Sequence, residues 1–248
     1  MYTTSSNRYR NIVSQAWASD MTKQTWQDIY SAGEQLNKYP YDFIVSSFFR
    51  YRSDINNDKP IKVLDLGCGA GNHTIFCAEN GAEVVAVDYS SAALDVVTQR
   101  AVDRGLQGSV RTRKVDFENF TLSENNFDMV IDRLAVSHVG RQHAVAVYDK
   151  VYEALNQDGI VLSNFFTTEH THKNFGEYDN DNEIWHNFTG GLFEHLKTAC
   201  FYDEEDIRGL FKKLSLQLLV RETERNELTE NQSKIEQMEI WKIIAKKI

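Results

Sequence analysis

Three glycines at alternate positions, Gly67, Gly69 and Gly71, lie between a predicted strand and a predicted helix. Glycine has no side chain, so it lets backbone N–H groups approach a ligand closely. Asp65 stands two residues before the first glycine, and Asp88 ends the next predicted strand. An acid at the tip of that strand can accept hydrogen bonds from both hydroxyls of a ribose. The pattern therefore predicts a ribose-containing ligand at this end of the fold.

The spacing of the glycines separates the classes of ribose-containing ligand. The dinucleotide fingerprint G-x-G-x-x-G requires its third glycine at the position that Asn72 occupies here. This register disfavours a nicotinamide cofactor. A nicotinamide-dependent oxidoreductase and a noncatalytic nucleoside-binding protein stay open as alternatives at this point.

The composition indicates a globular protein without a nucleic-acid-binding surface. The 248 residues are 42% hydrophobic and 25% charged, with a net charge of −9. Cys68, Cys77 and Cys200 form neither a disulfide framework nor a CxxC metal clip, which suits a reducing compartment. No apolar run has the length of a signal peptide or a membrane span. We therefore expect a cytoplasmic protein with no membrane or nucleic acid partner.

The elements that position these residues alternate between strand and helix from Ile61 onward. This order predicts an α/β fold, a three-layer sandwich with a mostly parallel, seven-stranded sheet that binds ligands at the carboxyl ends of its strands. Its last two strands are joined by the polar loop 221–234 and predict a closing antiparallel hairpin. The predicted strands are 61–66, 83–88, 109–116, 127–132, 159–166, 214–220 and 235–245.

Two further segments are expected beside this core. Residues 1–60 show helical spacing and predict an N-terminal helical cap that either forms a lid or covers one edge of the sheet. Residues 61–248 make up the rest of the same domain, with an acidic insertion at 165–202 that holds four of the seven histidines. The expected substrate contacts are Trp26, Tyr30 and Tyr39 from the cap and His170 and His172 from the insertion.

The two insertion histidines also raise the question of a metal. His170-x-His172 on an extended chain would place both rings on one side. A metal site is conceivable there, but histidines in a polar segment without a tighter ligand spacing are more often surface or substrate contacts. We therefore predict no metal.

These motifs resemble the small-molecule branch of the class I S-adenosylmethionine-dependent methyltransferases. The segment VLDLGCGAG is a near-ideal instance of the family's first motif, D/E-x-G-x-G-x-G. Residues 116–117, 127–139 and 155–165 are similar to its later motifs, and the closing hairpin fits its sheet. The resemblance implies a Rossmann-like fold and S-adenosylmethionine as the cofactor.

The resemblance further implies which residues hold the methionine and ribose parts of the cofactor. Gly67, Cys68 and Gly69 would line the methionine moiety, and Asp65 would orient the loop or the amino group. Asp88 would hold the ribose. Cys68 is expected to be a small loop residue, because nothing in the sequence pairs it with a base.

For the adenine, the resemblance places Tyr89 beside the base, Asp116 on its amine and Phe117 against its ring. Tyr89 and Phe117 as simple packing residues are the alternative. The main chain at Asp132 and Arg133 would lie near the amino group of the cofactor. Their side chains would either reach a polar substrate or pair with each other.

Methyl transfer is an in-line displacement, and a hydroxyl or ammonium acceptor must also lose a proton to a base. The resemblance implies His138 as that base, with a packed or capping histidine as the alternative. Residues 132–135 read DRLA, without the proline pair of base-methylating enzymes. We therefore expect transfer to oxygen or nitrogen of a small polar molecule, with a protein partner as the alternative acceptor and the oligomeric state open.

Overall fold

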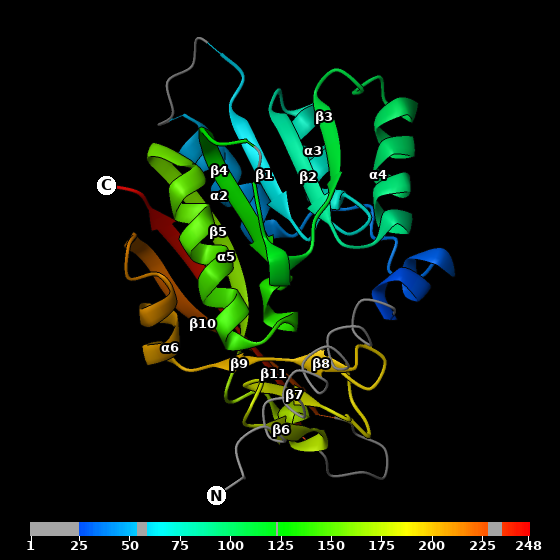
Figure 1. The fold of residues 1–248 in the computed structure, drawn as a ribbon, viewed down its shortest axis with the longest axis vertical. Coiled ribbons are helices and arrows are strands. Elements are labelled where there is room, and N and C mark those ends of the chain that lie inside the picture. The colour runs from blue at the N-terminus through cyan, green and yellow to red at the C-terminus, as the bar shows by residue number, and fades with distance from the viewer. Residues whose placement is uncertain (1–24, 54–58, 123, 228–234) are drawn as a thin grey trace, which may run out of the picture.

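The computed structural model describes residues 25–53, 59–122, 124–227 and 235–248. Its main sheet has the order β10-β11-β5-β4-β1-β2-β3, with the short strand β9 paired to β5 (Figure 1). Strands β1 to β5 are parallel, whereas β11 lies antiparallel between β5 and β10. The bounds are β1 Lys62–Leu66, β2 Glu83–Asp88, β3 Val110–Lys114, β4 Phe127–Arg133, β5 Leu155–Thr167, β9 Phe201–Tyr202, β10 Ser215–Glu227 and β11 Ile235–Lys246.

This topology confirms the predicted α/β fold, with its mostly parallel sheet and closing antiparallel hairpin. The strand order reverses at β1, because β2 and β3 follow on one side and β4 and β5 on the other. Such a reversal opens a crevice at the carboxyl ends of the strands, where ligands bind in this class of fold. The two-residue strand β9 was not predicted, since so short a segment carries no periodicity.

Helices cover both faces of the sheet and make the expected three layers (Figure 1). α5 Arg141–Ala154 and α6 Glu204–Leu210 pack on one face, and α2 Asp42–Arg52, α3 Asn72–Glu79 and α4 Ser91–Asp103 pack on the other. α4 begins where the Ser90 hydroxyl accepts a hydrogen bond from the Ala93 amide at 3.2 Å. α6 begins with a capping box between Asp203 and Asp206.

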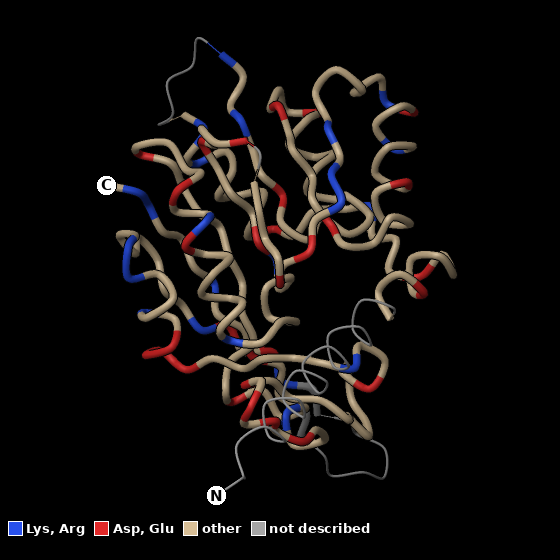
Figure 2. Tube along the Cα trace, viewed as in Figure 1, with Lys and Arg blue, Asp and Glu red and all other residues tan. Residues whose placement is uncertain are grey.

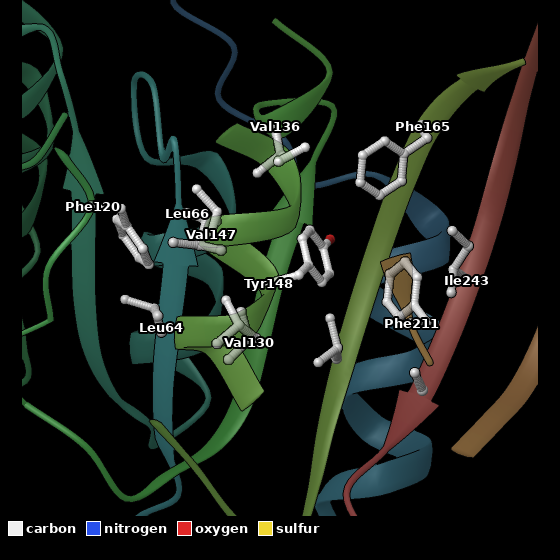
Figure 3. Packing of buried hydrophobic residues seen from close by; sticks show 14 of the residues in the cluster. Leu64, Leu66, Phe120, Val130, Val136, Val147, Tyr148, Phe165, Phe211 and Ile243 are labelled. Carbon is white, nitrogen blue, oxygen red and sulfur yellow. The ribbon is translucent and has the colours of Figure 1, made fainter. Parts of the chain in front are cut away.

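Side-chain alternation along the strands divides the core into two layers. In β2, Val85 and Val87 join the layer under α5, whereas Val84 and Ala86 join the layer under α3 and α4. Figure 3 shows the first layer, with Tyr148 of α5 directed at the sheet. A strand buried on both faces reads as a continuous apolar run, which is why EVVAVD was recognisable. Each fully buried valine stabilises the fold by about 1.5–3 kcal/mol.

The insertion folds into a small unit of its own beyond the carboxyl ends of the parallel strands (Figure 1). It contains the 3-10 helix η3 Thr171–Phe175 and an antiparallel sheet of β6 Glu177–Asp179, β7 Ile184–His186 and β8 Thr198–Ala199. A separate apolar cluster that includes Phe166, Phe193 and Phe201 holds this unit to the end of β5.

The hairpin is longer than the sequence indicated, and the expected polar loop at 221–234 is wrong over its first part. β10 continues to Glu227, and its pairing with β11 reaches Ile235. The physical reason is the limited pairing of β11 with β5. β11 pairs with β5 only from Ile240 onward, so the outer part of the hairpin projects past the sheet and needs no apolar face.

Of the expected cap, the structure describes α2 and the helical residues 25–31. Residues 1–24 and 54–58 lie outside the described residues. α2 buries Phe43, Ile44 and Phe48 in the layer that α3 shares. Residues 25–31 instead lie at the carboxyl ends of the strands, where the Gln27 side chain accepts hydrogen bonds from the hydroxyls of Ser90 and Ser91 at 3.0 and 3.3 Å.

Candidate functional site

A cavity of about 1180 Å³ lies at the reversal point of the sheet. Its walls come from the glycine loop, helical residues 25–31, the turn after β4, the insertion and the outer hairpin. Figure 2 shows acidic residues gathered where the central strands end. Ligand cavities usually measure about 300–1,000 Å³, so this one has room for a cofactor and a second small molecule.

The glycine loop adopts a backbone that only glycine accepts without strain. Gly67, Gly69 and Gly71 have φ of 60°, 52° and 78°. A Cβ on Gly67 would overlap the side chain of Ala135, and one on Gly69 would overlap the phenol of Tyr30. Both conformation and close packing therefore require glycine at 67 and 69.

Two buried acids hold this loop from below. The Asp88 carboxylate accepts hydrogen bonds from the amides of Gly69 at 2.9 Å and Ser90 at 2.8 Å. Asp65 accepts one from the Thr74 hydroxyl at 2.5 Å. Burial raises the pKa of Asp88, and burial, with the charge of Asp88 adding to it, raises the pKa of Asp65 to about 7. Each Asp88 oxygen keeps capacity for a further donor from the cavity.

The loop cysteine behaves as a packed side chain. The Cys68 thiol is buried and donates weakly to the Gly69 carbonyl at 3.7 Å. Burial raises its pKa well above the usual value, so the thiol stays protonated.

The residues expected around an adenine lie together on one wall of the cavity. Asp116 caps the 3-10 helix η1 Phe117–Asn119 by accepting a hydrogen bond from the Glu118 amide at 3.0 Å. The Phe117 ring lies edge-on to Phe120, and the Tyr89 ring carries the Lys114 ammonium over its face at 4.9 Å. Asp116, Phe117 and Tyr89 all line the cavity.

The turn after β4 separates two neighbours that the sequence considered as a pair. Asp132 is fully buried outside the cavity lining and accepts hydrogen bonds from the Ala135 and Val136 amides and the Tyr148 hydroxyl. Burial raises its pKa to about 6. Arg133 points into the cavity and stacks on the Tyr41 ring at 3.8 Å. The expected alternative of an Asp132–Arg133 ion pair is therefore wrong, and the Asp132 side chain supports the turn.

His138 lies half-buried in the cavity wall between Trp26 and Phe166, with ring centroids 5.4 and 5.8 Å away. Its Nδ1 is 2.8 Å from the Thr198 carbonyl oxygen, which can only accept, so Nδ1 carries the proton and Nε2 is an acceptor. Burial, and less strongly the charge of Arg133, lower the pKa of His138 to about 4. The ring is therefore neutral near pH 7.

The two insertion histidines both line the cavity, but not on an extended chain as expected. His170 caps η3, because its Nδ1 accepts a hydrogen bond from the His172 amide at 3.3 Å, and this local bond turns the chain. Their ring centroids are 5.1 Å apart, and burial lowers the pKa of His170 to about 4. Among the described residues, no three His, Cys, Asp or Glu side chains are grouped as a metal would require.

The expected cap residues divide into two kinds. Trp26 stacks on Tyr30 at 5.8 Å, and both line the cavity above the glycine loop. Tyr39 does not. Its side chain is 85% exposed and lies outside the cavity lining.

Several lining residues were missed in the sequence. His73 and Tyr41 come from the starts of α3 and α2, where the Tyr41 amide donates to His73 Nε2 at 3.4 Å. Glu222, Glu224 and Met238 come from the outer hairpin. The only signal for these residues in the sequence is the alternating polar pattern of the hairpin, which also fits the polar loop expected there.

Comparison with known proteins places residues 63–159 in a family described as a methyltransferase domain. The sterol 24-C-methyltransferase erg-4 of Neurospora crassa is 28% identical over 188 residues, which cover 73% of this chain and 45% of the relative. Phosphoethanolamine N-methyltransferase 3 of Arabidopsis thaliana is 32% identical over 102 residues, covering 41% of this chain and 20% of the relative. The chain thus spans less than half the length of these two relatives.

Solved structures share the fold over most of the chain. TehB from Haemophilus influenzae aligns with a TM-score of 0.61 and 16% identity, over 90% of this chain and 67% of that one. An S-adenosylmethionine-dependent methyltransferase from Clostridium acetobutylicum aligns with a TM-score of 0.58 and 17% identity, over 97% and 98%. Within the described residues, no helix combines the length and apolar character needed to cross a membrane.

Proposed function

Because the core of this chain belongs to the class I S-adenosylmethionine-dependent methyltransferases, we propose that the whole chain transfers a methyl group from this cofactor to oxygen or nitrogen of a small polar molecule. One observation carries the proposal. The glycine loop anchored by Asp88 and the neutral, half-buried His138 line the same cavity. A site suited to the cofactor and a candidate proton acceptor therefore share one cavity.

The residues present fit the cofactor, since the glycine loop, which has no room for a Cβ at Gly67 or Gly69, lines the same cavity as the Asp88 carboxylate. We assign the methionine moiety to the loop at Gly67, Cys68 and Gly69, with Asp65 beneath it. Asp88 would accept hydrogen bonds from the ribose hydroxyls through its remaining lone pairs.

We assign the adenine to the part of the cavity that Asp116, Phe117 and Tyr89 line. Asp116 would accept from the adenine amine, while Phe117 and Tyr89 would enclose the ring. The main chain at Asp132 and Arg133 would complete the site beside the methionine amino group.

When bound, the cofactor supplies a methyl group on a positively charged sulfur. The protein then has to position the acceptor, exclude water and take up a proton. Positioning alone can lower a barrier by about 7–11 kcal/mol at best. Trp26 and Phe166 flank His138 and shield it from bulk water. His138 Nε2 accepts the proton from the hydroxyl or ammonium of the acceptor, while Nδ1–H stays bonded to the Thr198 carbonyl.

The first test is ligand-induced stabilisation of the native state. S-adenosylhomocysteine should raise the Tm of the full chain, whereas NAD should not. No shift with saturating S-adenosylhomocysteine, or a larger shift with NAD, would contradict the proposal.

The second test is transfer itself. Isotope-labelled methyl from S-adenosylmethionine should appear in the small-molecule fraction of a cell extract after incubation with the protein. Label in the protein fraction alone would instead favour a protein acceptor.

A further inference from the structure

Arg133 is a cation in the cavity wall, and among the described residues no counter-ion faces it. It ends β4, lies half-buried and reaches the cavity. Within the part of the chain that the structure describes, its guanidinium makes one specific contact, the stack on the Tyr41 ring at 3.8 Å, and no hydrogen bond or ion pair. Arginines that are removed from water usually form charge-assisted hydrogen bonds, because an unpaired charge is costly there.

The surroundings make this arginine exceptional. Eight acidic residues line the cavity, and Arg133 is the one Lys or Arg among its described lining residues. The acidic lining residues are Glu34, Asp65, Asp88, Asp116, Glu118, Asp181, Glu222 and Glu224. None of the described acids lies within ion-pair distance of Arg133, although such a partner would offset its charge. The Arg133 guanidinium thus lies apart from the acidic side chains that line the cavity.

The stack on Tyr41 determines which part of the guanidinium is usable. A ring against one face leaves the in-plane N–H edge free, and that edge matches the two oxygens of a carboxylate. Tyr41 is itself held, because it precedes α2 and its amide donates to His73 Nε2. The backbone that carries the Tyr41 ring is therefore anchored beside the guanidinium.

We propose that Arg133 binds the carboxylate of a ligand in this cavity. Two sources share this chemistry: the methionine carboxylate of the cofactor, or an acidic group on the methyl acceptor. Both sources rest on the proposed function, whereas the binding of a free carboxylate to Arg133 does not require it.

The test compares two probes that differ only by a carboxylate, S-adenosylhomocysteine and its decarboxylated analogue, by calorimetric titration of the full chain. If the cofactor supplies the carboxylate, Arg133→Gln should weaken the binding of S-adenosylhomocysteine by about 10- to 100-fold, as expected for the loss of a hydrogen-bonded charge pair. The same substitution should leave the affinity for the decarboxylated analogue unchanged. Arg208→Gln is the matched control, since Arg208 is an exposed arginine on α6 outside the cavity lining.

A second arm tests the acceptor source. Protein saturated with S-adenosylhomocysteine is titrated with benzoate as a small carboxylate probe. Binding that is present in the wild type and in Arg208→Gln but absent in Arg133→Gln would support this source.

The proposal is overturned if Arg133→Gln changes neither the preference for the carboxylate-bearing probe nor the binding of benzoate. If S-adenosylhomocysteine fails to bind the wild type, the proposed function fails, and benzoate titration of the ligand-free protein still decides the role of Arg133. The Tm of Arg133→Gln should not fall below that of the wild type, because the change removes an unpaired charge.

Discussion

The Gly69 amide donates a hydrogen bond of 2.9 Å to the Asp88 carboxylate, which ties the glycine loop to the tip of β2. The same carboxylate holds the Ser90 amide at the start of α4. One buried acid thus fixes the loop, the strand end and the next helix, while it also borders the cavity.

Asp88→Ala should therefore weaken S-adenosylhomocysteine binding by about 10- to 100-fold, because it removes a charged acceptor and loosens the loop. His138→Gln should leave that affinity within a few-fold and lower kcat by about 10²–10⁴-fold, since it removes the proposed base. Calorimetry and a methyl-transfer assay separate the two effects.

Asp95→Ala is the matched control for Asp88, because Asp95 is an exposed aspartate on α4. It should change neither affinity nor kcat. Equal loss of affinity in the Asp88 and His138 variants would remove His138 from the role of base.

The core of the fold and the glycine loop were accessible from the sequence because local patterns determine them. Strands buried on both faces are continuous apolar runs, and the glycine loop needs glycine both for φ and for space. The turn at His170 was not accessible, because a side-chain bond to the His172 amide replaces the extended chain.

The other walls of the cavity depend on contacts between segments far apart in the sequence. Arg133 stacks on Tyr41 from another element, and the outer hairpin supplies Glu222 and Glu224. The exposure of the Tyr39 side chain likewise has no signal in the local sequence. Contacts between distant segments leave no periodic pattern in the sequence, so this part of the site could not be predicted without the structure.

The glycine loop makes a prediction about sterics alone. Gly67 and Gly105 both have positive φ, but a Cβ on Gly67 would overlap Ala135, whereas one on Gly105 would meet open space. Gly105→Ala should lower the free energy of unfolding by about 1–2 kcal/mol for backbone strain. Gly67→Ala should cost about 1–3 kcal/mol more for overpacking. Urea unfolding measures both.

A double variant separates the cost of the clash from the cost of the backbone conformation. Gly67→Ala combined with Ala135→Gly should recover most of the steric part, as a double-mutant cycle detects. If Gly67→Ala proved no worse than Gly105→Ala, the close approach of the loop to the turn after β4 would be contradicted.

Asp65 gives a pH dependence of stability with a definite sign. Its pKa is about 7 in the folded protein and 3.8 as the ordinary value, so between these pH values the native state binds a proton that the unfolded state has lost. The free energy of unfolding should fall by about 1.4 kcal/mol per pH unit over this window as pH rises.

Asp65→Asn should lack this contribution, because its side chain does not titrate. The stability of the wild type relative to the variant should decline from pH 4 to pH 7 in denaturant titrations. The buried Asp132 acts in the same direction in both proteins and cancels in the comparison. A constant difference across the window would contradict the assigned burial of a protonated Asp65.

Arg133 and His138 should be coupled through charge. Burial lowers the pKa of His138 to about 4, and the positive charge of Arg133 lowers it further than burial alone. Arg133→Gln should therefore raise this pKa without restoring its ordinary value of 6.5, and it should raise the pKa of His73 for the same reason. NMR titration of the imidazole signals measures both shifts. Arg208→Gln removes the same charge at a distance and should change neither pKa.

A bound ligand gives a second readout of the same coupling. A carboxylate bound to Arg133 would also offset its charge. If the cofactor supplies that carboxylate, S-adenosylhomocysteine should raise the pKa of His138 in the wild type, and the decarboxylated analogue should raise it less. A pKa for His138 that is the same in the wild type and in Arg133→Gln would contradict the coupling.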